Sequence, residues 1–373
     1  VLFAGTLAGT IGTADIDTTD VKITAADVFT FSLSGGVLFA GVGGALDGNR
    51  ENYLQQGTGF GAQGASMELI TVSGGTVTAG GTAGDAWSAY RITVGQAEAL
   101  GLEGITLRAY DFVVAGNTLT DVATTGTASV KMNWVELTDT FPALTLTSAT
   151  TGIRDTVDFD LRGAVEVDIQ GYVLGLGTFT MKIENFDGVT DTSQPAFEAQ
   201  MLTITLANVN LFAGVGGAFT RVDPADPLSR AEGIDSSQGT GFVVNNATLN
   251  IVSLKDVSNA NAMNNPSIVT WNAVTIAADG VGLQGLPDDL EFTITEFFFN
   301  MNLDSTTTAT TGNFTPSRLT WGALVYDDGI AANTDLPLPD SISSLTAAER
   351  IAFGGNLIVN IGGGVLVAGS LTG

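Results

Sequence analysis

Residues 202–218 read "LTITLANVNLFAGVGGA" and carry two signals that decide the fold. The first is alternation, since Leu202, Ile204 and Leu206 fall on one side of an extended chain and threonines fall between them. A period of two residues is typical of a β-strand with one buried face and one solvated face. It also argues against a buried parallel α/β sheet, whose strands are continuously apolar. We therefore predict an all-β protein.

The alternation slips by one residue at several places. In "LEFTITEFFFNMNL" (residues 290–303) the inward, apolar set changes phase across Thr295 and Glu296. Similar slips occur at Tyr110–Asp111 and at Ala26–Asp27. Such a slip marks a bulge, or a corner at which the strand turns and keeps its apolar side inward. Because a solenoid needs corners repeatedly, we predict an elongated β-solenoid resembling a parallel β-helix, with tandem β-sandwich domains as the alternative.

One stretch carries a helix signal. In "TAAERIAF" (residues 346–353), Thr346 and Glu349 have the spacing of a capping box. We expect one or two helical turns between Ala347 and Phe353, and little helix elsewhere.

The second signal in the opening stretch is repetition. "LFAGVGGA" occurs at residues 38–45 and again at 211–218, and "QGTGF" follows both copies. The four tryptophans then form two matched pairs, Trp87 with Trp271 and Trp134 with Trp321. Features that recur in the same order indicate an internal repeat.

The ends of the repeats set their boundaries. The opening "VLFAGTLAG" resembles "VLVAGSLTG" near the C-terminus, which makes Val1, Val173 and Val365 equivalent starting points. We predict tandem units of about 180 residues, namely unit 1 at residues 1–172, unit 2 at 173–364, and the start of a third at 365–373.

The composition excludes several functions. The chain of 373 residues has 39 acidic and 13 basic residues, a net charge of −26, and neither cysteine nor histidine. Nucleic-acid binding needs a basic surface, and imidazole or thiolate zinc sites need residues that are missing here. We expect no nucleic-acid partner and no membrane insertion, since no apolar run has the length of a membrane helix. Val1 opens without Met or a basic leader, so we expect an internal piece of a longer chain.

Units that carry "LTITLANVNLFAGVGGA", "GTGF" and "LGLEGITLRAYDFVV" resemble the long repeat regions of giant bacterial surface proteins and adhesins, which often also carry calcium-binding RTX segments. The resemblance implies an extracellular, cell-surface location and a repetitive β architecture. It implies no calcium site of the RTX kind, because the "GGxGxDxUx" nonapeptide does not occur in this chain.

Carboxylates are the abundant reactive groups. Calcium is bound by six to eight oxygens, commonly at turns, and two acidic clusters are candidates. They are Asp15, Asp17 and Asp20 in "DIDTTD", and Glu184, Asp187 and Asp191 in "ENFDGVTD". The alternative is that these acids are solvated at strand ends.

The sequence thus favours a structural function. We predict a cell-surface stalk, fibre or sheath component, or an adhesive one. Its expected partners are further repeat units, identical chains placed end to end, or a surface polysaccharide. The alternative is a carbohydrate-active β-helix enzyme, a polysaccharide lyase or hydrolase that uses paired carboxylates. Duplication argues against it, because an active site rarely occurs as two loosely matched copies.

Overall fold

The computed structural model describes residues 2–373 apart from 51, 55–56, 123–128, 191–195, 227, 259–268, 287–289, 308–316, 328–333 and 363–364. Strands make up 67% of the chain and helices 4%, so the prediction of an all-β protein is confirmed. Within the described residues, no helix has the length and apolar composition needed to span a membrane.

The chain forms two compact units. The first comprises Val1–Glu103 and Arg108–Gly163, and the second comprises Gly104–Leu107 and Ala164–Gly373. The division falls within β7, near the boundary at residue 172 expected from the repeat.

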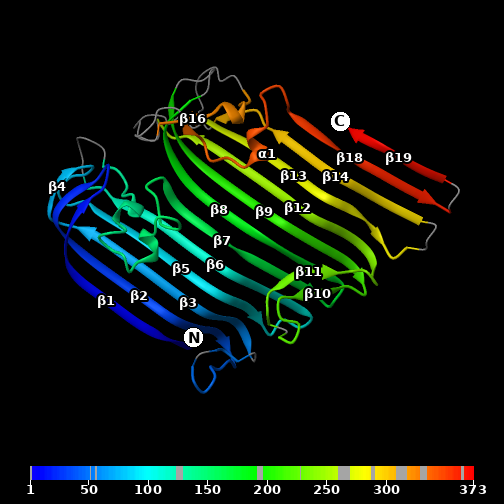
Figure 1. Ribbon diagram of the computed structural model, residues 1–373, viewed down its shortest axis with the longest axis horizontal. Helices are drawn as coiled ribbons and strands as arrows, with labels where there is room; N and C mark the ends of the chain where they lie inside the picture. Colours follow the sequence, from blue (N-terminus) through cyan, green and yellow to red (C-terminus); the bar gives the residue numbers. More distant parts are fainter. Residues whose placement is uncertain are drawn as a thin grey trace. The chain divides into compact units, whose positions relative to one another are not determined.

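The first unit is built on an antiparallel meander in which consecutive long strands are neighbours (Figure 1). The strands in hydrogen-bonded order are β1 (Leu2–Asp17), β2 (Lys22–Val42), β3 (Thr58–Ser73), β5 (Ala86–Leu100), β6 (Ile105–Thr120) and β7 (Val157–Ile169). The short elements are β4 (Thr76–Ala79), which pairs with β2, and the 3-10 helices η1 (Trp134–Leu137) and η2 (Thr145–Thr147).

The second unit repeats this plan. Its long strands in hydrogen-bonded order are β8 (Val173–Val189), β9 (Phe197–Val215), β12 (Thr240–Asp256), β13 (Val269–Gln284), β14 (Leu290–Asn302), β18 (Ile351–Ile361) and β19 (Val365–Thr372). Two small hairpins are β10 (Ala218–Arg221) with β11 (Ala231–Asp235), and β16 (Val325–Tyr326) with β17 (Thr334–Asp335). The remaining elements are β15 (Thr306–Thr307), η3 (Trp321–Ala323) and α1 (Asp340–Ser343).

The described strand pairs with a defined register are antiparallel, as β1 with β2 and β12 with β13 illustrate. A parallel β-helix stacks parallel strands, so these pairs do not form the parallel β-helix predicted from the sequence. The phase slips that suggested corners have a different cause. They are bulges inside long strands.

Each slip lies at or beside a residue in the left-handed region. Ala25, Asp111 and Glu296 have φ angles of 51°, 50° and 53°, which are uncommon for residues other than glycine. Glu296 lies where the register of β14 against β18 shifts, between Thr295 and Phe298. A bulge adds one residue and bends the strand without ending it. The alternation therefore changes phase while the apolar residues stay on one face.

The two units place equivalent residues in equivalent cross-strand pairs. Val72 of β3 is opposite Trp87 of β5, and Leu254 of β12 is opposite Trp271 of β13. Each pair belongs to the hydrophobic core of its unit. The tryptophan match found in the sequence is thus a match of packing position as well.

In each unit the main core lies on one face of the sheet, at the end where the long loops return. The first unit has a smaller cluster apart from it, formed by Val37, Phe39, Tyr53 and Leu100. Trp87 and Trp134 are fully buried in the first unit, and Trp321 and Ile342 are fully buried in the second. Trp134 and Trp321 come from 3-10 helices in the loops, and Ile342 comes from α1. Short helical turns therefore cover this part of each sheet.

The helix predicted between Ala347 and Phe353 is wrong. The residues after Thr346 form a turn, in which the Glu349 N–H donates to the Thr346 carbonyl at 3.1 Å. Ile351 then begins β18 and faces Met301 of β14. Pairing along the sheet overrides the capping signal, and the four-residue helix α1 lies just upstream.

Candidate interaction face

The second unit's sheet carries rows of apolar side chains that cross neighbouring strands. Residues opposite one another on β8, β9, β12, β13, β14 and β18 are apolar in two rows. The first row is Phe179, Leu206, Leu249, Ile276, Phe299 and Phe353. The second row is Met181, Ile204, Ile251, Val274, Met301 and Ile351. Residues two apart on a strand share a face, so both rows lie on one side, here named the apolar face.

The first unit has the same arrangement. One row consists of Leu7, Leu33, Met67 and Ile92, which face one another across β1, β2, β3 and β5. The next row consists of Gly9, Phe31, Leu69 and Tyr90. None of these rows in either unit contains a charged residue, although the chain carries a net charge of −26.

The apolar face is partly exposed, whereas the opposite face is buried where the loops return. Phe353 and Ile351 keep 38% and 52% of their surface exposed, and Leu7 keeps 60%. Leu254 and Ala273, which point to the other side, are fully buried. Exposed apolar side chains that adjoin one another make this face a candidate interaction site.

This outcome corrects one expectation from the sequence. Ile204, Phe299 and Met301 belong to the apolar set that was expected to point into the core, yet they are only half-buried. The loops cover the other face. Small buried residues there, such as Ala273 and Thr275, leave space for the side chains of the returning loops. Alternation reveals that a strand has two faces, but it does not reveal which of them the loops cover.

Beside the core, the covered face of the second unit carries a polar network. The Thr205 hydroxyl donates to Asn250 Oδ1 at 2.8 Å, and Asn250 Nδ2 donates to Ser341 Oγ at 2.9 Å. Ser341, on α1, also lies 2.7 Å from the Thr275 hydroxyl. These bonds hold α1 against β12 and β13 and satisfy polar groups that would otherwise be costly to bury.

A buried asparagine anchors the returning loop in each unit. In the first unit, Asn117 Oδ1 accepts from Trp134 Nε1 at 2.9 Å. Its Nδ2 donates to the carbonyls of Met132 and Arg154 at 3.0 and 2.9 Å. In the second unit, Asn302 makes the same three contacts, with Trp321 Nε1 at 3.1 Å and with the Leu319 and Thr346 carbonyls, both at 2.9 Å. The repeat thus extends to individual hydrogen bonds.

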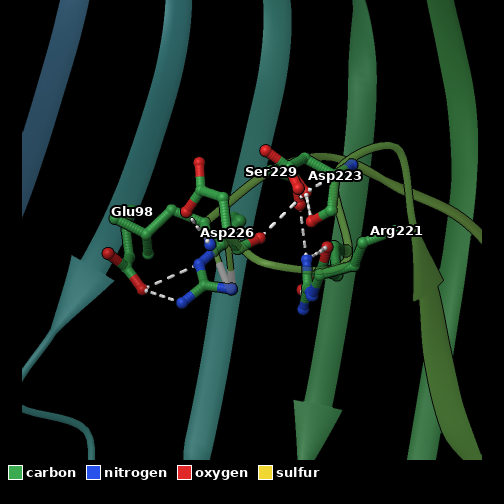
Figure 2. Close-up of polar contacts among 8 residues, drawn as sticks. Glu98, Arg221, Asp223, Asp226 and Ser229 are labelled. Atoms are coloured by element: carbon green, nitrogen blue, oxygen red, sulfur yellow. Dashed lines mark hydrogen bonds and ion pairs between the residues drawn. The ribbon is translucent and has the colours of Figure 1, made fainter.

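Each unit also holds a glutamate paired with an arginine (Figure 2). In the first unit, Arg108 Nε and Nη2 both lie within 2.9 Å of Glu98 Oε1. Tyr53 donates its hydroxyl hydrogen to Glu98 Oε2 at 3.4 Å. Burial, and then the negative charge of Glu98, raise the pKa of Tyr53 above its usual value.

The second pair is bidentate. Arg221 Nη1 and Nη2 donate to the two oxygens of Glu166 at 3.0 and 2.7 Å, and Nη1 also donates to the Ser229 carbonyl at 2.6 Å. The Ser229 hydroxyl in turn donates to the Asp223 carbonyl at 2.8 Å. Figure 2 shows Arg221, Ser229 and Asp223 gathered at this loop. The first pair joins the strands β5 and β6, and the second joins β7 to the hairpin that begins with β10, so both buried glutamates have a structural role.

Asp85 organises a loop in the first unit. It is 1% exposed, and its carboxylate accepts from the N–H groups of Thr82 and Val122 at 2.7 and 3.0 Å and from the Ser129 hydroxyl at 2.6 Å. Burial by itself would raise the pKa of Asp85, but these hydrogen bonds favour the charged form and lower the pKa below its usual value.

The first cluster predicted to bind calcium lies at the end of β1 and in the turn that follows it. Asp15 Oδ1 accepts the Ala25 N–H at 2.8 Å, and Asp17 pairs with Lys22. Asp20 lies in the turn between β1 and β2. Partial burial, and then the negative charge of Asp20, raise the pKa of the half-buried Asp155.

In the second cluster, Glu184 and Asp187 lie on β8, and Asp191 lies outside the described residues. Across the part of the chain that the structure describes, no three acidic side chains converge as a metal site would require. The calcium hypothesis stays a prediction without geometric support.

The apolar face was missed from the sequence because its residues were assigned to the core. A signal existed, since "EFFFNMNL" (residues 296–303) is more apolar than a half-solvated strand requires. Comparison with protein-family models, with curated proteins and with solved structures found no match to this chain.

Proposed function

We propose that this chain is a structural repeat segment of an extracellular protein, a stalk, fibre or sheath component of the cell surface. In this proposal the units are building blocks that extend a sheet by adding strands. The apolar face is the surface on which the protein assembles with its neighbours.

The observation that carries the proposal is the repetition of one plan at every level. Within each unit the long strands follow the same order, a tryptophan contacts the buried asparagine, and apolar rows lie on the face that the loops leave uncovered. A catalytic or ligand-binding protein needs one constellation of residues. A protein that works by length and lateral contact gains from copies, as tandem repeat proteins do.

The composition supports a location outside the cell. The excess of 26 negative charges favours solubility through self-repulsion. The chain contains no cysteine, so incorrect disulfide bonds cannot form in it in an oxidising environment.

The test is surface labelling of intact cells that make the protein. An antibody raised against the 373-residue chain should stain unpermeabilised cells, and added protease should remove the staining before a cytoplasmic marker is lost. Staining that requires permeabilisation would overturn the proposal. The structural role is tested separately, by deleting the gene and measuring the thickness of the surface layer by electron microscopy, which should fall.

A further inference from the structure

β1 and β19 lie at the two ends of the strand order. β1 is hydrogen-bonded to β2 and β19 to β18, and within the described residues neither has a strand on its other side. β1 is exposed along most of its length, with Ile11 86% and Leu7 60% exposed. An open strand edge of this kind can pair with another strand.

The sequences of these two strands are nearly interchangeable. Residues 1–9 read "VLFAGTLAG" and residues 365–373 read "VLVAGSLTG", with six of nine positions identical. The three differences are conservative in size or polarity. The edge of β18 therefore already binds, within this chain, a strand that closely resembles β1.

We propose that β1 of a second copy takes the place of β19 on β18, so that copies join by strand exchange. The proposal rests on the proposed structural function, and it names the partner and the register. In the register of the β18–β19 pair, Thr6 of the incoming strand occupies the position of Ser370, opposite Asn356, and Gly9 occupies the position of Gly373, opposite Phe353.

β1 has matching residues at two positions where the side chain of β19, or its absence, makes a defined contact. Ser370 donates its hydroxyl hydrogen to Asn356 Oδ1 at 2.9 Å, and Thr6 supplies a hydroxyl at the same position. A Cβ atom added at Gly373 would lie 2.3 Å from the Phe353 ring, so a larger residue there would displace that ring. β1 has Gly9 there.

The incoming strand also makes an apolar contact at the start of β18. In the same register, Ile11 falls opposite Ile351, which is 52% exposed. A cross-strand apolar pair of this kind stabilises a sheet by about 0.2–1 kcal/mol. The exchanged pairing therefore includes an apolar cross-strand contact at Ile351.

The chain contains a precedent for the exchanged arrangement. β8, which is equivalent to β1 and β19, lies between β7 and β9 in the strand order. The pair Leu174–Phe212 on β8 and β9 corresponds to the pair Leu2–Phe39 on β1 and β2. A β1 strand that keeps β2 on one side and gains β18 on the other would repeat the surroundings of β8.

The experiment uses two single-cysteine variants of the full 373-residue chain, which contains no native cysteine. Thr6→Cys and Asn356→Cys are mixed, oxidised and separated on a non-reducing gel. Directly opposed strand residues have Cα atoms about 4.5–5.5 Å apart, within the span of a disulfide. The matched control uses Ala8→Cys in place of Thr6→Cys. In the proposed register, Ala8 lies diagonal to Asn356, with about 7–8 Å between their Cα atoms.

We expect the Thr6→Cys mixture to give a disulfide-linked product of two chains. Its yield should rise with protein concentration and exceed the yield from the Ala8→Cys mixture several-fold. Circular dichroism confirms that each variant remains folded. No two-chain product from folded protein would overturn the proposal, and equal products from both mixtures would overturn the register. Either failure, with surface staining still positive, would reject strand exchange and leave the proposed function standing.

Discussion

Replacing Asn117 with alanine tests whether the buried asparagines hold the loops to the sheets. Asn117 is 2% exposed, and its amide makes three hydrogen bonds, with Trp134 Nε1 and with two loop carbonyls. Alanine cannot replace any of them. The change therefore leaves one buried donor and two buried acceptors in the first unit without this partner.

The expected loss follows from those three bonds. A hydrogen bond contributes about 0.5–1.5 kcal/mol net, and a buried polar group left without a partner costs about 1–3 kcal/mol. Water that enters the vacated space would recover part of this energy. We expect Asn117→Ala to lower the free energy of unfolding of the first unit by about 2–4 kcal/mol.

Hydrogen exchange followed by mass spectrometry measures this loss for each unit, because peptides report opening locally. Asn302→Ala is the matched variant, since Asn302 is 1% exposed and makes the same contacts in the second unit. The two variants should show losses that agree within about 1 kcal/mol, each in its own unit. A loss below about 0.5 kcal/mol in either unit would refute the anchoring role.

Three further predictions concern the apolar face, pH and metal ions. Phe299→Ser should reduce binding of an apolar dye and cost less than about 1.5 kcal/mol, because full burial of such a side chain is worth only ~1.5–3 kcal/mol; unchanged dye binding would contradict an open face. The pKa of Asp85 is lowered in the folded state, so its stabilising effect is present above the unfolded pKa of about 3.9 and is lost as pH falls through the folded value. Asp85→Asn should therefore flatten the dependence of stability on pH below about pH 4, and an unchanged slope in denaturant titrations would argue otherwise. Because Asp15 and Asp17 already bind Ala25 N–H and Lys22, calcium and magnesium at equal ionic strength should shift the melting temperature equally; a calcium-specific rise that Asp20→Asn removes would support the calcium hypothesis.

The strand content and the tryptophan cores could be predicted from the sequence. Alternation such as that around Ile204 depends on local backbone geometry, which every β architecture shares. The matched pair Trp87 and Trp271 occupies equivalent core positions because packing depends on residue size, which both copies retained.

The strand direction could not be predicted. A one-residue slip in the alternation, as at Glu296, gives the same sequence pattern whether the chain turns a corner or forms a bulge. The bulge is distinguished from a corner by the φ angle of 53° at Glu296 and by the antiparallel pairing of β14 with β18. Three-dimensional pairing, and not the local pattern, carried that information.

The candidate face could not be predicted for a related reason. Ile276 and Ala273 alternate on one strand, and hydrophobicity assigns the larger residue to the core. Coverage instead depends on where the loops bearing Trp321 and Ile342 return. Those loops are distant in sequence from β13, so no local pattern could report their position.

The order of the strands has a consequence for how the chain reaches its folded state. Each long strand pairs with the one made just before it, so a strand that leaves a ribosome or a secretion channel meets a partner that has already emerged. Mostly sequential pairing keeps loop-closure costs small, and small costs favour rapid folding. Bulges at Ala25, Asn208, Asn246 and Glu296 would oppose sliding of a strand past its neighbour by a residue pair. A chain of any number of such units could fold progressively from its leading end, at a pace set by synthesis or export rather than by its length.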